Sequence, residues 1–169
     1  ACRQNYIDNS QIRIKVNALI GHTGFVGSNI LRQLDFNYCY NSNNIADIRH
    51  RSFDLVVCSG LRSMKWFVNK SPLEDLGSID ILMDNLSTIT AKQFVLVSTI
   101  DVYNQTSNVD EDTIIDIGKC DHYGKHRLLF ETFACDLFST YILRLPTLFG
   151  NNLRKNAIYD LLVKKYSFL

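Results

Sequence analysis

Strong charge of one sign and long apolar runs are both absent from this chain. Its 169 residues carry 18 Lys and Arg against 17 Asp and Glu, a formal net charge of +1. A near-balanced charge creates no field that attracts nucleic acid or an anionic membrane, so neither partner is expected. No stretch approaches the roughly eighteen uninterrupted apolar residues of a membrane helix, and residues 1–10 lack the apolar core of a signal peptide. We therefore expect a soluble, cytoplasmic protein.

Cysteine pairs and metal-ligand spacings are missing as well. The five cysteines include no C-x-x-C pair, so they fit neither a disulfide framework nor a zinc site. Cys39 and Cys58 lie in apolar runs, where a free thiol acts as a small buried hydrophobe, in keeping with a reducing cytoplasm. The four histidines show no ligand spacing with carboxylates or thiols. We expect no metal site and assign the histidines to turns or the surface.

Glycine and proline are scarce, yet three of the eight glycines fall within seven residues: Gly21, Gly24 and Gly27. Before them, residues 12–20 begin with period-2 alternation and end as an apolar run, which is typical of a strand entering a buried sheet. After them, residues 28–34 place their apolar side chains on one helical face. The order is strand, glycine-rich turn, helix.

The same alternation of strands and helices continues along the chain. Further strands are predicted at 36–40, 53–58, 93–98 and 140–145, and helices at 44–50, 72–86, 123–138 and 156–165. This order predicts an α/β fold, a Rossmann-like doubly wound parallel sheet abbreviated to about five to six strands. We expect residues 1–11 to form an N-terminal extension and residues 12–169 a single domain.

Each glycine of the turn has a mechanical reason to be there. Gly21 allows the tight turn, Gly24 lets the backbone approach a pyrophosphate, and Gly27 lets the helix pack against the strand. The first N–H groups of the helix then face the phosphates. The turn therefore predicts a dinucleotide site, with a ligand-free tight turn as the alternative. The predicted cofactor-binding residues in this turn are Gly21, Thr23, Gly24, Phe25, Val26 and Gly27.

The spacing G-x-x-G-x-x-G resembles that of the short-chain dehydrogenase/reductase superfamily, and residues 21–29 are similar to its extended branch of nucleotide-sugar epimerases, dehydratases and reductases. Three more segments resemble family motifs in family order: S98-T-I-D-V-Y103, Y123-G-K-H-R-L-L-F-E131 and L143-R-L-P-T-L-F-G150. C58-S-G60 stands where the family lines the cofactor cleft. The resemblance covers roughly residues 14 to 165.

The resemblance implies a catalytic role for three residues. Tyr123 would exchange a proton with the substrate oxygen while hydride moves to or from the nicotinamide, and Thr99 would hydrogen-bond that oxygen. The family has lysine four residues after the tyrosine, and this chain has Arg127. A cation about 4 Å from a phenolate is worth roughly 4 kcal/mol, on the order of three pKa units. Arginine supplies the charge, but its planar guanidinium need not keep the lysine's ribose contacts. The alternative is a helix that only packs.

The resemblance also implies the remaining cofactor contacts. Ser98 would support the cofactor side of the cleft. The other implied cofactor-binding residues, with Tyr123 and Arg127, are Asn41, Ser42, Cys58, Ser59, Gly60, Pro146 and Thr147. No carboxylate ends the second strand, and Asn41 and Ser42 suit a ribose hydroxyl or a 2′-phosphate, which Arg49 could also reach. The cofactor is therefore NAD or NADP.

The expected function is an NAD(P)-dependent oxidoreductase or epimerase acting on a sugar or nucleotide-sugar carbonyl or alcohol. Dehydration is disfavoured, because Ile100 follows Thr99 where family dehydratases carry an acid; Asp101 keeps a weaker possibility of acid/base work. The alternative is a non-catalytic NAD(P)-binding module of the same fold. Against the resemblance, the substrate lobe is expected to be truncated or absent. A homodimer is possible by analogy.

Overall fold

A parallel sheet forms the centre of the computed structural model, which describes residues 16–103, 105, 107–150 and 153. Within them the sheet has five strands: β1 (Asn17–Ile20), β2 (Tyr38–Tyr40), β3 (Ser52–Cys58), β4 (Thr90–Thr99) and β5 (Thr140–Leu145). Every pairing is parallel, and the order is β2-β1-β3-β4-β5. The order reverses between β1 and β3, so the crevice for a ligand is expected at their carboxyl ends.

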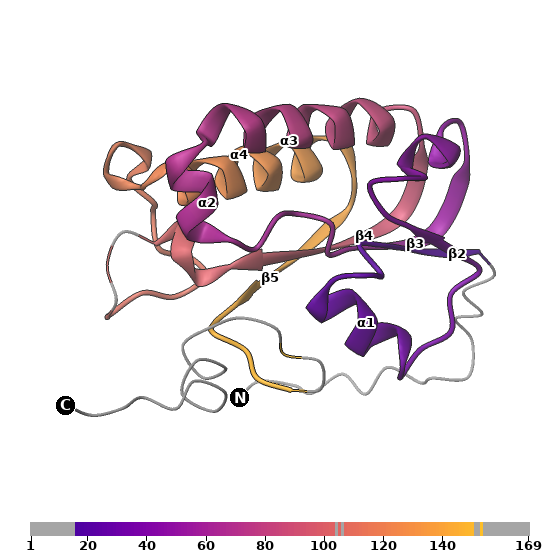
Figure 1. The fold of residues 1–169 in the computed structure, drawn as a ribbon, viewed down its shortest axis with the longest axis horizontal. Helices are drawn as coiled ribbons and strands as arrows, with labels where there is room; N and C mark the ends of the chain where they lie inside the picture. The colour runs from indigo at the N-terminus through magenta and orange to yellow at the C-terminus, as the bar shows by residue number, and fades with distance from the viewer. Residues whose placement is uncertain (1–15, 104, 106, 151–152, 154–169) are drawn as a thin grey trace, which may run out of the picture.

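Helices lie on both faces of this sheet. They are α1 (Phe25–Leu31), α2 (Lys65–Lys70), α3 (Pro72–Leu86) and α4 (His122–Leu137). Short 3-10 segments span Ile45–Ile48 (η1), Ile100–Val102 (η2) and Ile117–Lys119 (η3). Figure 1 shows α2, α3 and α4 on one face and α1 on the other. The predicted doubly wound, Rossmann-like α/β fold is confirmed.

The core joins α3 and α4 to the middle of the sheet. Phe94 of β4 stacks on Phe138, with ring centroids 4.7 Å apart. The other members of this buried cluster include Ile20, Val56, Leu86 and Phe130, from β1, β3, α3 and α4. Burial of these apolar side chains removes them from water and holds the two helices against one face.

Most predicted elements have bounds close to the observed ones. The helix 72–86 and the strand 140–145 are as predicted, and Pro72 stands in the first turn of its helix. β4 is longer than expected, and α2 is a short helix between the predicted strand 53–58 and the predicted helix 72–86. Residues 12–15 of the first predicted strand, the extension 1–11 and the segment 156–165 lie outside the described residues. No helix in the described ranges is long and apolar enough to cross a membrane.

Replacement of Gly27 tests how closely α1 packs on the turn. A Cβ at Gly27 would lie 2.1 Å from the Gly21 carbonyl oxygen, and this backbone atom cannot move aside cheaply. We expect Gly27→Ala to destabilise the fold by about 2 kcal/mol or more, measured by urea unfolding.

The matched control is Gly77→Ala on α3. A Cβ there meets nothing within 4 Å, so the higher helix propensity of alanine should stabilise the fold by about 0.5–1 kcal/mol. A Gly27→Ala variant as stable as the wild type would contradict the packing.

Candidate active site

A pocket of about 950 Å³ lies at the carboxyl ends of the central strands. Eleven predicted site residues line it: Thr23, Gly24, Phe25, Val26, Ser59, Ser98, Thr99, Tyr123, Arg127, Pro146 and Thr147. The sheet therefore brings the glycine turn, the end of β4, the start of α4 and the loop after β5 to one place. Another six do not line the pocket: Gly21, Gly27, Asn41, Ser42, Cys58 and Gly60.

Gly21 and Gly27 shape the turn from behind. Gly21 has a φ of +85°, and a Cβ there would lie 2.5 Å from the Ser59 carbonyl oxygen. The turn after β1 thus rests directly on the backbone that leaves β3. Gly27 is buried in α1 and rests on the Gly21 carbonyl. Only residues without a side chain permit both contacts.

The segment after β3 supports the turn in a similar way. Ser59 donates its hydroxyl to the Ile20 carbonyl at 3.0 Å. A Cβ at Gly60 would lie 3.0 Å from Ile20 Cγ2. Cys58 is fully buried, and burial raises its thiol pKa to about 12. Cys58 is the buried hydrophobe that the sequence predicts, whereas Cys39 is only partly buried.

Asn41 and Ser42 directly follow β2 and are not part of the pocket lining. The Asn41 side-chain oxygen accepts the Asn43 N–H at 2.8 Å, and the Asn41 N–H donates to Asn44 Oδ1 at 2.7 Å. These bonds close the turn on itself. Arg49, the candidate phosphate ligand, instead pairs with Asp84 of α3 at 3.0 Å.

Thr99 and Tyr123 enter the pocket from two elements. Thr99 ends β4, where its hydroxyl donates to Asp101 Oδ2 at 3.2 Å and accepts the Asp101 N–H at 3.1 Å. Tyr123 is the second residue of α4, which begins with Asp121 accepting the Gly124 N–H at 2.8 Å. This side-chain cap fixes where α4 starts and so where Tyr123 lies.

Burial is the largest influence on the pKa of Tyr123. Removal from water raises the pKa of the phenol, and the carboxylates of Asp101 and Asp75 raise it further. The charges of Arg127 and Lys65 lower the pKa but do not outweigh burial. The Arg127 guanidinium lies 4.8 Å from the centre of the Tyr123 ring. Arg127 thus acts in the direction predicted, and the phenol keeps its proton at neutral pH.

Arg127 shares its charge with a buried carboxylate. It is 2% exposed, and its Nη2 donates to Asp75 Oδ2 at 2.6 Å. His126 Nδ1 lies 2.8 Å from the same oxygen. Arg127 Nε and Nη1 are buried without a hydrogen-bond partner. The surface position predicted for His126 is therefore wrong, because α3 presents a buried carboxylate to it.

A second polar network lies behind Ser98. Its hydroxyl donates to Glu131 of α4, and Arg144 of β5 donates to the same carboxylate at 2.8 Å. Arg144 also donates to the Tyr103 hydroxyl at 2.7 Å. Ser98 lines the pocket, but its hydroxyl ties β4 to α4. Sequence reasoning gave no role to Glu131 or Arg144.

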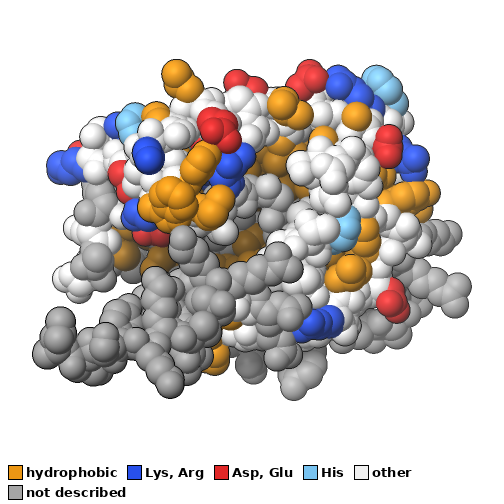
Figure 2. All heavy atoms as spheres, in the orientation of Figure 1, with side chains coloured by type: hydrophobic (Ala, Val, Ile, Leu, Met, Phe, Trp, Pro, Cys, Tyr) orange, Lys and Arg blue, Asp and Glu red, His pale blue; other side chains and the backbone are white. Residues whose placement is uncertain are grey.

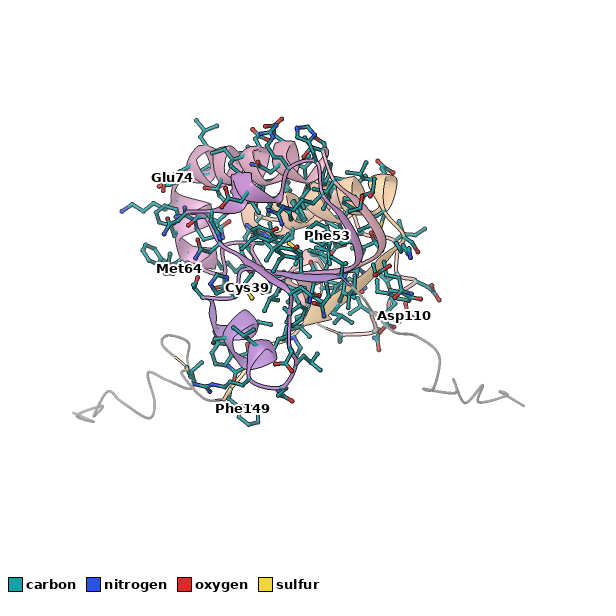
Figure 3. The ribbon with its side chains drawn as sticks, turned by 90° about the vertical axis from the view of Figure 1, so that its right-hand side faces the viewer. Cys39, Phe53, Met64, Glu74, Asp110 and Phe149 are labelled. Carbon is teal, nitrogen blue, oxygen red and sulfur yellow. The ribbon has the colours of Figure 1, made fainter. Side chains whose placement is uncertain are left out.

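The loop after β5 passes close to α1. Pro146 and Thr147 line the pocket, and a Cβ at Gly150 would lie 3.6 Å from the Phe25 ring. Figure 3 shows Phe149 beside α1. The loop therefore borders the pocket on the side of the glycine turn.

Helix α2 forms another wall. Met64, Lys65 and Trp66 line the pocket, and Trp66 remains 55% exposed. Figure 2 shows hydrophobic side chains beside acidic and basic ones over this part of the surface. Among the described residues, no group of three or more His, Cys, Asp or Glu side chains is arranged to hold a metal ion.

No family model matches the chain, and no curated protein matches its sequence. Solved structures share its fold. A dTDP-4-dehydrorhamnose reductase from Clostridium acetobutylicum matches with a TM-score of 0.66 at 16% identity, over 86% of this chain and 57% of its own. RMD from Pseudomonas aeruginosa, complexed with NADPH, matches with a TM-score of 0.64 at 16% identity, over 82% of this chain and 56% of its own.

A UDP-glucuronic acid 4-epimerase from Bacillus cereus, in complex with NAD, gives a TM-score of 0.60 at 16% identity, over 82% of this chain and 58% of its own. The resemblance to NAD(P)-dependent enzymes of the short-chain dehydrogenase/reductase type is therefore confirmed at the level of the fold. The chain spans less than three fifths of the length of these three proteins.

The Asp75 carboxylate should be essential for the stability of the α3–α4 pair. Asp75→Ala leaves the Arg127 charge buried without its partner, so we expect a loss of about 3–5 kcal/mol in urea unfolding. Asp80→Ala, at an exposed position of the same helix, should change stability by less than about 0.5 kcal/mol. Replacement of both charges, Asp75→Leu with Arg127→Met, should recover much of the loss. Equal effects of Asp75→Ala and Asp80→Ala would refute this assignment.

Proposed function

We propose that this chain is the cofactor-binding part of an NAD(P)-dependent oxidoreductase or epimerase that acts on a sugar or nucleotide sugar at a carbonyl or alcohol carbon. The observation that carries this proposal is the meeting of Thr99, Tyr123 and the glycine turn around one pocket at the switch point of the sheet. Solved structures with this fold include a dTDP-4-dehydrorhamnose reductase and a UDP-glucuronic acid 4-epimerase, which supports the substrate class.

The residues present fit a dinucleotide. The absence of a Cβ at Gly21 and Gly27 lets the turn pack closely on the end of β3 and on α1, and Gly24, which lines the pocket, lets the backbone approach a pyrophosphate. Ser59, Pro146 and Thr147 would contact the nicotinamide half, while Asn41 and Ser42 would meet the adenosine ribose of NAD or the 2′-phosphate of NADP. When bound, the nicotinamide supplies or accepts the hydride.

The chain's own residues manage the proton. A carbonyl oxygen that becomes an alcohol needs one proton, and the Tyr123 hydroxyl can donate it, because a phenol is protonated at neutral pH. Burial raises the pKa of this phenol further. Thr99 would orient the same oxygen. The Arg127 charge, held 4.8 Å from the ring, would stabilise the phenolate that remains. Ile100 offers no acid, which disfavours dehydration.

A non-catalytic NAD(P)-binding module is the second candidate. It is favoured by Arg127, whose charge is shared with Asp75 and whose Nε and Nη1 are buried without a hydrogen-bond partner. In both cases we infer a cytoplasmic protein that acts on, or binds, small molecules. A homodimer through α3 and α4 would cover Leu73 and Ile81, which are 83% and 60% exposed.

Turnover by the wild-type chain separates the two candidates, and removal of the Tyr123 hydroxyl tests the role of the phenol. The wild-type chain should bind NAD(H) or NADP(H) in calorimetry and should exchange hydride with a probe such as UDP-glucuronic acid or dTDP-4-dehydrorhamnose, followed by nicotinamide absorbance. Tyr123→Phe should lower turnover by about 10²-fold or more, since general acid catalysis by one side chain contributes roughly that much.

Tyr141→Phe is the matched control, because Tyr141 is exposed on β5 outside the pocket lining, and it should leave turnover unchanged. Cofactor binding without turnover of any probe would favour the non-catalytic module. Unchanged turnover in Tyr123→Phe would refute the catalytic role of the phenol.

A further inference from the structure

Helix α2 touches both of the proposed catalytic elements. Lys65 and Asn69 lie four residues apart, one helical turn, and so share a side of α2. Lys65 reaches the loop that follows β4, and Asn69 reaches the start of α4. The family motifs do not include this helix, and the proposed function assigns it no role.

Lys65 connects α2 to Thr99. Its ammonium donates to Asp101 Oδ1 at 2.7 Å, a short charge-assisted bond. The other oxygen of Asp101 accepts the Thr99 hydroxyl at 3.2 Å, and the Asp101 N–H returns a bond to Thr99 at 3.1 Å. Lys65 therefore holds the Asp101 carboxylate in place, and this carboxylate in turn holds the Thr99 hydroxyl.

Asn69 connects α2 to Tyr123. Its side-chain oxygen accepts the Tyr123 N–H at 3.0 Å, and its amide group donates to Asp121 Oδ2 at 3.1 Å. Asp121 caps α4 and also lies 3.3 Å from the Lys65 ammonium. Asn69 thus satisfies one of the N–H groups that an α-helix leaves unpaired in its first turn.

These bonds form one continuous chain: Thr99, Asp101, Lys65, Asp121, Asn69, Tyr123. We propose that Lys65 and Asn69 are positioning residues that set the Thr99 hydroxyl against the Tyr123 phenol for proton transfer. The inference rests on the proposed function for its kinetic consequence and on the contacts alone for its geometry. It assigns to α2 the placement of two groups that come from β4 and α4.

The bonds that link Thr99 to Tyr123 through α2 involve partly exposed side chains, so their loss should affect positioning more than folding stability. The side chains of Lys65, Asp101 and Asp121 are 44%, 42% and 37% exposed, and ion pairs this accessible contribute little to folding. A shift of the reacting groups by about 1 Å, however, can cost about a hundredfold in rate. Loss of these bonds should therefore appear in the rate and hardly in the unfolding midpoint.

The charged groups around Tyr123 provide a second test of the proposal, because removal of Lys65 should change the pKa of the phenol. Asp75 and Arg127 face the phenol from α3 and α4, Asp101 from η2 and Lys65 from α2. Lys65 remains charged: burial lowers its pKa, but the bonds to Asp101 and Asp121 outweigh burial and raise it. Removal of Lys65 deletes a cation and leaves the Asp101 carboxylate unbalanced, so both changes raise the pKa of Tyr123.

The experiment compares Lys65→Met with Lys70→Met. Lys70 is exposed on the same helix, so the two variants delete the same charge from the same element. Lys65→Met should lower kcat by about tenfold to a hundredfold, with the KM for UDP-glucuronic acid, or for whichever probe the wild type uses, and the cofactor Kd changed by less than about threefold. Lys70→Met should match the wild type, and Lys65→Arg should restore much of the rate because it restores the charge.

The second measurement needs no turnover. The phenol of Tyr123, assigned by comparison with Tyr123→Phe, is titrated by ¹³C NMR of labelled tyrosine in each variant. Its pKa should rise in Lys65→Met and stay unchanged in Lys70→Met. A kcat of Lys65→Met equal to that of Lys70→Met, or an unmoved Tyr123 titration, would overturn the proposal. If the wild type turns over no probe, the proposed function fails, and the titration still decides whether Lys65 sets the surroundings of Tyr123.

Discussion

The contact between the glycine turn and the end of β3 is the constraint on which the pocket depends. At Gly21 the chain leaving β1 comes so close to the Ser59 carbonyl that a Cβ would lie 2.5 Å from it. Because β1 and β3 are adjacent and parallel, their carboxyl ends share one edge of the sheet, and the two loops must part there. One turns to α1 on one face, and the other leads to α2 and α3 on the opposite face, as Figure 1 shows. The pocket opens where they separate.

The fold could be predicted from the sequence because each signal was local. The run before Gly21, the three glycines and the apolar face after them describe one strand–turn–helix unit, and that unit recurs along the chain. Such periodicity can be recognised in the sequence without knowledge of tertiary contacts. The exception is α2, a six-residue helix whose start at Lys65 has no side-chain cap. Its position follows from bonds to Asp101 and to the start of α4, which lie 36 and 54 residues away.

The site likewise contains some residues that the sequence predicts and others that it does not. Thr99, Tyr123 and the turn were found because they stand in motifs with fixed spacing. The partners of Arg127 were not, although one signal was present: Asp75 occupies the same buried helical face as Ile79, Leu82 and Leu86. A carboxylate on such a face needs a buried cation or donor, and Arg127 and His126 are those groups. Residues that pair across 51 and 52 positions cannot be matched by spacing alone.

The replacement of lysine by arginine changes how the charge near the phenol is held. A lysine ammonium is a compact point charge that can be shared freely, whereas a guanidinium binds in fixed directions. Here one of those directions is taken by Asp75, so Arg127 is anchored to α3 while its guanidinium carbon lies over the Tyr123 ring. Asp75 in turn raises the pKa that Arg127 lowers. The pair therefore acts on the phenol as a dipole, weaker than a free cation. Burial therefore outweighs the two cations and raises the pKa of Tyr123. The second cation near the phenol is Lys65 of α2.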